Sequence, residues 1–274
     1  RIDDAAITRV AREASARAGR PLPDYASLWR WSIDDIAGFW RAVWDFTGVI
    51  ATTPPSRTID DPQRMPGARF FADATLNFAQ NLLARGPADD TRDALVFRGE
   101  DKVSRRLSHA ELTAEVSRFA QALAAQGVVA GDRVAAYLPN MPEAIVAMLG
   151  ATSRGAVWSS CSPDFGANGV LDRFGQIAPR VLFCADGYRY AGKEIDSLAR
   201  AREVGARIPA IERVVVVPYL RRRPDLASFP GAVEWGDFLS AHRDAGLRFD
   251  RKPFDHPLYI MYSSGTTGLP KGMV

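Results

Sequence analysis

Short apolar runs alternate with segments of helical spacing along residues 133–217. The apolar runs have the length and composition of buried strands, and they occupy residues 133–138, 156–160, 180–185 and 213–217. Between them, apolar residues recur at helical spacing over residues 142–153, 171–177 and 192–204. Because such alternation buries both faces of a sheet under helices, the pattern predicts an α/β fold with a mostly parallel sheet.

A hairpin and a capped helix are predicted just before this region. Residues 95–97 and 102–107 have strand character and are joined by a short turn. Ser108 and Glu111 then stand at the spacing of a capping box, which opens a helix. That helix is predicted to continue to Gly127, a residue typical of a helix C-terminus.

The amino-terminal part of the chain lacks this alternation. The pattern of residues 1–20 predicts a polar helix that ends at Gly19. Residues 27–50 are rich in Trp and Phe at a spacing that predicts a helix packed on a larger body. Residues 52–67 are rich in Pro, Thr and Arg and are predicted to form an extended connector.

Composition fits a soluble globular protein. Of the 274 residues, 47% are apolar and 24% are charged, so burial can stabilise the fold without disulfides or a structural metal. The 35 basic residues nearly balance 32 acidic ones, which leaves a net charge of +3. The tight basic run at residues 221–223 follows an apolar strand and is interpreted as a solvated loop. No nucleic-acid partner is therefore expected.

Cysteine and histidine spacing supports neither a metal site nor a nucleophile. Cys161 and Cys184 belong to no C-x-x-C pair, and both are interpreted as reduced thiols in the core or in a loop. The three histidines are dispersed, which gives neither a zinc site nor a catalytic triad. With no signal peptide and no apolar run near the ~20 residues of a membrane span, a cytoplasmic protein without a membrane partner is expected.

One segment carries the chemistry. A strand predicted at residues 258–262 runs directly into SSGTTGLPKG, residues 263–272. Small residues let backbone N–H groups approach a polyphosphate, hydroxyls add donors, and Lys271 adds positive charge. The segment therefore predicts a phosphate-binding loop, whose structural alternative is a flexible turn. Its spacing excludes a Walker loop and a G-x-G-x-x-G dinucleotide loop.

Residues 263–271 resemble the signature phosphate loop of the adenylate-forming enzymes, which include acyl-CoA synthetases, luciferases and the adenylation domains of peptide synthetases. The segments GDRV, PNMPE and GAVWSS, at residues 131–134, 139–143 and 155–160, resemble the first subdomain of that family in the right order. The resemblance covers about residues 30–274. It implies part of the large N-terminal domain of such an enzyme, with helices flanking the sheet, truncated after the phosphate loop.

Two further segments resemble particular branches of this family. Segments within residues 70–82 resemble the amino-terminal region of acetyl-CoA and acetoacetyl-CoA synthetases, which luciferase-like members generally lack. Residues 158–166, WSSCSPDFG, look more like acetoacetyl-CoA synthetases than like the acetate enzymes. The resemblance implies two regions: residues 1–90 form an N-terminal helical and extended region, and residues 91–274 form the first part of the AMP-binding domain.

The resemblance implies an ATP-dependent acid–CoA ligase. Such enzymes transfer AMP from ATP to a carboxylate, release pyrophosphate, and let the CoA thiol attack the acyl-adenylate; Mg²⁺ is normally needed, and acetoacetate is the favoured acid here. The resemblance implies catalytic roles for Lys271, Thr266 and Thr267. It implies that the ATP phosphates are bound by Ser263, Ser264, Gly265, Thr266, Thr267, Gly268 and Lys271. Arg173 matches a position near the CoA nucleotide, where the alternative is a surface arginine on a helix.

Several groups of the resembled family are expected beyond residue 274. They are a Tyr-x-x-Thr-Glu segment that touches AMP and Mg²⁺, a ribose-binding aspartate, and a lysine that contacts the carboxylate. None occurs in this chain, which is therefore read as an N-terminal fragment that by itself forms neither adenylate nor CoA ester and holds no metal ligands. Two alternatives stay open: a ligase for another small carboxylic acid, and a non-catalytic nucleotide-binding domain.

Overall fold

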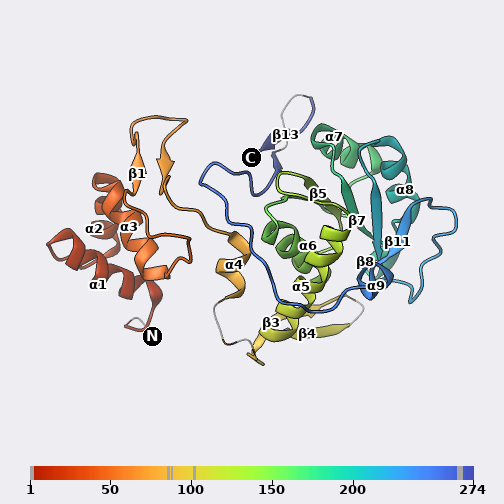
Figure 1. Cartoon of the computed structure of the whole chain (residues 1–274), viewed down its shortest axis with the longest axis horizontal. Helices are drawn as coiled ribbons and strands as arrows, with labels where there is room; N and C mark the ends of the chain where they lie inside the picture. Colours follow the sequence, from red (N-terminus) through yellow and green to blue (C-terminus); the bar gives the residue numbers. More distant parts are fainter. Residues whose placement is uncertain (1–2, 85–86, 88, 101–102, 264–267) are drawn as a thin grey trace. The chain divides into compact units, whose positions relative to one another are not determined.

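The computed structural model describes residues 3–84, 87, 89–100, 103–263 and 268–274 (Figure 1). It divides into two compact units. The first contains Arg1–Asn77 and Arg251–His256, and the second contains Phe78–Asp250 and Pro257–Val274. The predicted division into regions at residues 1–90 and 91–274 stays a prediction.

The first unit is built mainly from three helices. These are α1 (Ala6–Ala18), α2 (Tyr25–Asp34) and α3 (Ile36–Thr47). They pack around a small apolar core that includes the buried Leu28 and Trp31. The predicted helix over residues 1–20 is confirmed, and it ends at Gly19 in the left-handed backbone region that glycine favours.

The single helix predicted over residues 27–50 is wrong, because the structure has two helices there. The break falls at Asp35, whose backbone leaves the helical region and whose carboxylate accepts the N–H of Gly38 at 2.8 Å. Aspartate in this role caps a new helix, so the aromatic spacing continues across a change of direction. Farther along, the predicted connector contains β1 (Ile59–Asp60), which pairs antiparallel with β2 (Arg69–Phe70).

The second unit contains a five-stranded sheet in the order β11-β10-β7-β5-β6, with every neighbouring pair parallel. Its strands are β5 (Arg133–Tyr137), β6 (Val157–Cys161), β7 (Val181–Ala185), β10 (Arg213–Val217) and β11 (Ala232–Glu234). The four strands expected from apolar runs are all present, and the predicted α/β class with a parallel sheet is confirmed.

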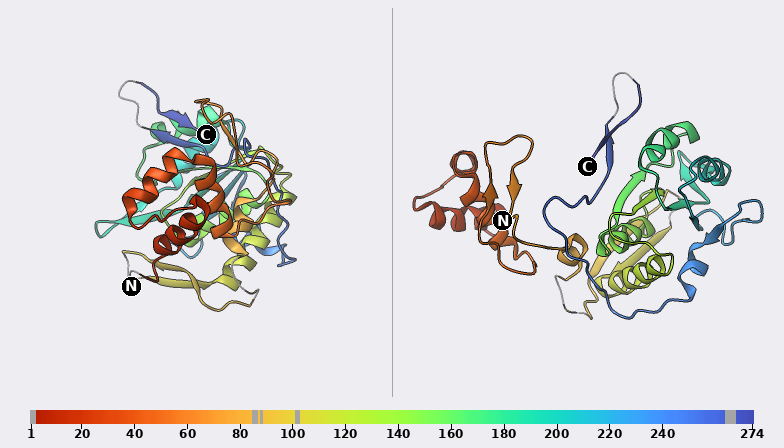
Figure 2. Two further views of the ribbon diagram at one scale, coloured as in Figure 1. Left: turned by 90° about the vertical axis from the view of Figure 1, so that its left-hand side faces the viewer. Right: turned by 45° about the horizontal axis from the view of Figure 1, so that its top comes forward.

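Helices cover both faces of this sheet (Figures 1 and 2). On one face lie α5 (His109–Ala125), α6 (Pro142–Ser153) and the short α9 (Trp235–Ser240), and on the other lie α7 (Ala167–Ile177) and α8 (Leu198–Arg207). Strand β5 shows why both faces must be apolar: Val134 and Ala136 enter one core, and Ala135 and Tyr137 enter the other.

The hairpin and capped helix before the sheet are confirmed. Strands β3 (Asp93–Arg98) and β4 (Ser104–Ser108) pair antiparallel. The hydroxyl of Ser108 accepts the N–H of Glu111 at 3.1 Å, and the Glu111 carboxylate accepts the N–H of Ser108 at 2.8 Å. Each partner satisfies a backbone donor of the other, as the capping-box spacing predicts.

The helix predicted over residues 192–204 begins too early. Residues in its first turn belong to a hairpin of β8 (Gly187–Tyr190) and β9 (Lys193–Asp196), and α8 follows it. The turn uses Ala191 and Gly192, both with positive φ, a conformation that no helix contains. Helix α7 begins four residues before the predicted Leu171, and β11, α9 and α4 (Phe78–Leu83) were not predicted.

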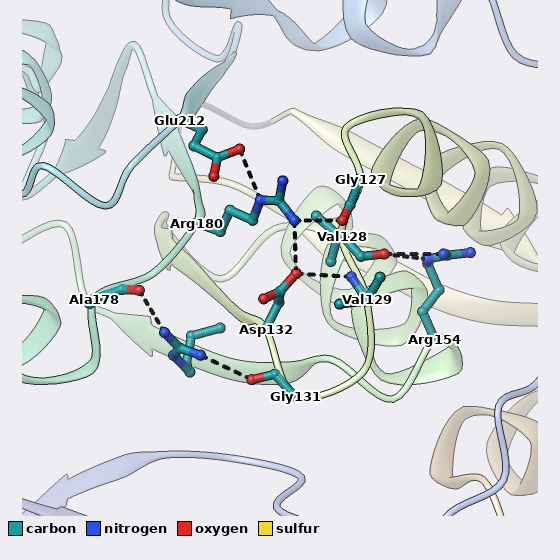
Figure 3. Close-up of polar contacts among 10 residues, drawn as sticks. Gly127, Val128, Val129, Gly131, Asp132, Arg154, Ala178, Arg180 and Glu212 are labelled. Carbon is teal, nitrogen blue, oxygen red and sulfur yellow. Dashed lines mark hydrogen bonds and ion pairs between the residues drawn. The ribbon is translucent and has the colours of Figure 1, made fainter.

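A polar network lies at the amino ends of three strands (Figure 3). Arg180, just before β7, donates to Glu212 before β10 at 2.9 Å and to Asp132 before β5 at 3.1 Å. The Asp132 carboxylate also accepts the N–H of Val129 at 2.9 Å. The GDRV segment around Asp132 therefore has a structural role at the edge of the sheet where strands begin.

Close packing between α5 and α6 depends on Gly150. A Cβ added there would lie 2.4 Å from the ring of Phe119, which is fully buried. Although alanine favours helices, we expect Gly150→Ala to destabilise the protein by about 2 kcal/mol, because an overfilled core must shift. Urea unfolding, with hydrogen exchange in residues 109–125 and 142–153, measures the effect.

The matched change is Gly175→Ala on α7, where an added Cβ meets no atom within 4 Å. There we expect a gain of about 0.5–1 kcal/mol from helix propensity alone. If both substitutions stabilised the protein, the α5–α6 contact at Gly150 would not be as tight as described.

Candidate functional site

The segment that leads to the predicted phosphate loop is attached to the edge of the parallel sheet. The N–H of Trp158 donates to Leu258 O at 3.0 Å, and the N–H of Ile260 donates to Trp158 O at 2.8 Å. Tyr259 thus forms a parallel bridge with Trp158 of β6. Because the segment runs parallel to β6, it brings Ser263 to the carboxyl end of that strand, where ligands of α/β sheets bind.

The strand predicted over residues 258–262 is present as two short pieces with different partners. After the bridge to β6, the chain continues as β12 (Met261–Ser263), which pairs antiparallel with β13 (Lys271–Met273). The change of partner after Ile260 turns the end of the sheet segment into a hairpin. Among the described residues after the loop, 268–274, the regular element is the strand β13.

The described part of the predicted phosphate loop forms the two ends of this hairpin. Ser263 stands opposite Lys271 in the strand register, and both are exposed. Gly268 has a φ of 92°, in the region that favours glycine. The remaining predicted phosphate ligands lie outside the described residues: Ser264, Gly265, Thr266 and Thr267.

Arg173 lies on α7 beside the same hairpin. Its guanidinium carbon is 4.1 Å from the ring centroid of Phe165 and 5.9 Å from that of Tyr262, and its Nη1 donates to Gly169 O at 2.7 Å. Two aromatic rings and a carbonyl therefore fix the direction of a half-buried positive charge. The structure brings Arg173 next to the residue that precedes Ser263.

Three residues that the sequence pattern does not single out also contact the hairpin. The Tyr262 hydroxyl donates to Arg173 O at 2.8 Å, and Gln176 Nε2 donates to Pro270 O at 3.0 Å. The hydroxyl of Ser159, a buried residue of β6, donates to Ile260 O at 2.8 Å. These partners lie 89 to 101 residues apart, so no local signal could have found them.

The neighbouring thiol, that of Cys161, is buried and disfavours the thiolate form. Burial raises the pKa of Cys161 to about 12, an effect that the positive charge of Arg173 partly offsets. Burial likewise raises the pKa of Cys184 to about 12. Both cysteines are free and buried, which confirms their interpretation as reduced thiols.

A second loop at the carboxyl edge is organised by a buried carboxylate. Asp186, which follows β7, is fully buried and accepts the backbone N–H groups of Tyr219, Leu220 and Arg221 at 2.7, 2.9 and 2.8 Å. The Arg221 side chain also donates to Asp196 at 2.8 Å. The basic run at residues 221–223 lies in an exposed loop after β10, as predicted.

The described residues also bear on metal binding and on membrane insertion. Among them, no three His, Cys, Asp or Glu side chains come together in a way that could hold a metal ion. Over the same residues, none of the helices is both long and apolar enough to cross a membrane. The positive charges of Lys271 and Arg173 are the features that suit an anionic ligand.

A parallel sheet whose carboxyl edge is reached by the strand before a Ser/Thr/Gly-rich segment, with an exposed lysine after that segment, is typical of enzymes and domains that bind nucleotide phosphates. The chain belongs to the family of AMP-binding enzymes, whose family model matches residues 85–274. A second model, the acetyl-coenzyme A synthetase N-terminus, matches residues 25–82. The resemblance inferred from the motifs is confirmed.

Among the relatives are proteins named for one reaction. The chain is 51% identical to acetoacetyl-coenzyme A synthetase of Rhizobium meliloti (strain 1021), over 94% of this chain and 39% of that protein. It is 39% identical to acetoacetyl-CoA synthetase of Macaca fascicularis, over 98% and 41% respectively. A solved structure, acetoacetyl-CoA synthetase from Streptomyces lividans, matches with 43% identity and a TM-score of 0.91, covering 99% of this chain and 41% of that one. The chain thus spans about two fifths of the length of these relatives.

Proposed function

We propose that the chain is part of an ATP-dependent acid–CoA ligase that converts acetoacetate, ATP and CoA to acetoacetyl-CoA, AMP and pyrophosphate. The observation that carries this proposal is the 51% identity with a protein of that name over 94% of the chain. The matched residues include the hairpin with Ser263 and Lys271 as well as the amino-terminal region.

In the proposed reaction the acid carboxylate attacks the α-phosphorus of ATP, and pyrophosphate leaves. The CoA thiol then attacks the acyl carbon, and AMP leaves. The hairpin residues act in the first step: Ser263, Gly268 and Lys271, with the loop between them, would hold the β and γ phosphates and compensate the charge of the departing pyrophosphate. Arg173, aimed by the rings of Phe165 and Tyr262, would contact the CoA nucleotide.

Mg²⁺ enters the proposal as the counter-ion of the ATP phosphates. The described residues offer it no group of carboxylates, so no residue of this chain is assigned to the ion. A cytoplasmic location is part of the same proposal, since two free buried thiols fit a reducing compartment.

ATP–pyrophosphate exchange by the whole protein that contains this chain tests the proposal. Acetoacetate is compared with acetate, propionate, butyrate and benzoate. We expect acetoacetate to give the fastest exchange and acetoacetyl-CoA to form when CoA is added. Faster exchange with another acid would keep the ligase chemistry and remove acetoacetate. No exchange with any acid, together with retained ATP binding, would indicate a non-catalytic nucleotide-binding domain.

A further inference from the structure

Helix α7 contacts the β12–β13 hairpin on its first strand and directly before its second strand. On the first strand, the Tyr262 hydroxyl donates to a carbonyl in the middle of α7, that of Arg173, at 2.8 Å. Directly before the second strand, Pro270 O accepts from Gln176, in the last turn of α7, at 3.0 Å. Tyr262 directly precedes Ser263, and Pro270 directly precedes Lys271.

Tyr262 is held so that its hydroxyl remains a donor. Its ring is half-buried between α7 and the carboxyl end of β6, and this burial raises the pKa of the phenol. Its hydrogen bond with the Ser159 side chain acts in the opposite direction. The Ser159 hydroxyl donates to Ile260 O, so the segment that leads to the hairpin is bonded to the sheet as well as to α7.

Gln176 contacts the residue before the second strand from a fixed position. Its Nε2 also donates to Asp172 O, one turn back on α7, at 2.5 Å, and this second contact restricts the side chain. A hydrogen bond from one side only would leave the hairpin free to rotate about its first strand. The two hydrogen bonds, on Tyr262 and on Pro270, restrict that rotation, and each lies one residue away from a predicted phosphate ligand.

We propose that Tyr262 and Gln176 are positioning residues that hold Ser263 and Lys271 in register with α7 for binding of the ATP phosphates. This inference rests on the proposed function, and it adds two residues to which the motif itself assigns no role. It also makes α7 a shared support, because the same helix carries Arg173. A displacement of a charged group by a fraction of an ångström weakens its contacts, so positioning should appear in affinity for ATP rather than in affinity for the acid.

Binding of ATP and of inorganic tripolyphosphate to the whole protein, measured by isothermal titration calorimetry, tests the proposal. Tyr262→Phe removes the hydroxyl and keeps the ring, and Gln176→Met removes the N–H donor at nearly constant size. We expect each variant to bind both ligands about threefold more weakly, and the double variant about tenfold more weakly, as for the loss of one and two modest hydrogen bonds. The KM for the acid should stay unchanged.

Matched controls make the same chemical changes away from α7. Tyr190→Phe alters an exposed tyrosine of β8, and Gln121→Met removes a glutamine of α5 that donates to Arg243 O. Both should bind ATP as the unaltered protein does. If all variants bound ATP equally well, the positioning role would be wrong and the proposed function would stand. If the unaltered protein bound neither ATP nor tripolyphosphate, both would be wrong. Equal losses for ATP and for the acid, with a lowered unfolding midpoint, would also count against positioning.

Discussion

Replacing Lys271 by alanine is expected to slow acetoacetate-dependent ATP–pyrophosphate exchange by about 100-fold, the loss typical of removing one preorganised donor to developing charge. Lys271 is exposed and stands opposite Ser263 at the loop end of the hairpin. Its ammonium group would compensate the charge that builds up on the departing pyrophosphate, so its removal acts on the chemical step as well as on ATP binding. Exchange by the whole protein at saturating ATP and acid measures the effect.

Lys193→Ala provides the matched control. It removes the same charge from an exposed position on β9, and we expect its exchange rate to stay within about twofold of the unaltered protein, as surface substitutions usually do. Lys271→Arg keeps the charge but changes its shape, and an intermediate rate is expected. Equal rates for Lys271→Ala and Lys193→Ala would remove Lys271 from the proposed site.

Replacing Asp186 by alanine is expected to destabilise the protein by about 3 kcal/mol, because it removes a buried acceptor shared by three partly buried backbone N–H groups. The carboxylate is fully buried and accepts three successive backbone N–H groups, those of residues 219–221. Asp186→Asn should cost less, since a carbonyl oxygen remains while the new amide nitrogen faces a donor. Urea unfolding gives the change in free energy of unfolding, and hydrogen exchange at residues 219–221 shows whether the loss is local.

Asp225→Ala is the comparison within the same loop. Its exposed carboxylate accepts a single N–H group, that of Ala227, at 3.0 Å. We expect a cost of about 0.5 kcal/mol or less there, the usual range for exposed positions. Similar costs for both aspartates would show that burial at Asp186 adds nothing to the worth of its hydrogen bonds.

Features set by neighbouring residues could be predicted from the sequence. The capping box of Ser108 and Glu111 closes over three residues, and the apolar strand β10 needs only its own composition to indicate burial. The phosphate-loop motif belongs to the same group, because its residues are consecutive. Its assignment to ATP stays a prediction at every one of its positions.

Features set by distant partners could not be predicted. The hydroxyl of Tyr262 meets α7 only because residues 258–260 pair with β6. An aspartate after a strand, such as Asp186, looks like a solvated loop residue until the loop after β10 folds over it. The sequence did not predict the β8–β9 hairpin for a different reason: the residues of β9 fall within the helical pattern that begins at Gly192, where the positive φ of Gly192 forms a turn instead.

The short bridge between residues 258–260 and β6 bears on how this sheet meets other molecules. Strand β6 is the last in the sheet order, and an outermost strand displays main-chain groups to which a foreign strand could add. Residues 258–260 of the same chain already form hydrogen bonds with both the N–H and the C=O of Trp158, near the middle of β6. The protein thus covers part of its own sheet edge. A neighbouring copy would find the main-chain groups of Trp158 already hydrogen-bonded, which disfavours aggregation by strand addition at this point.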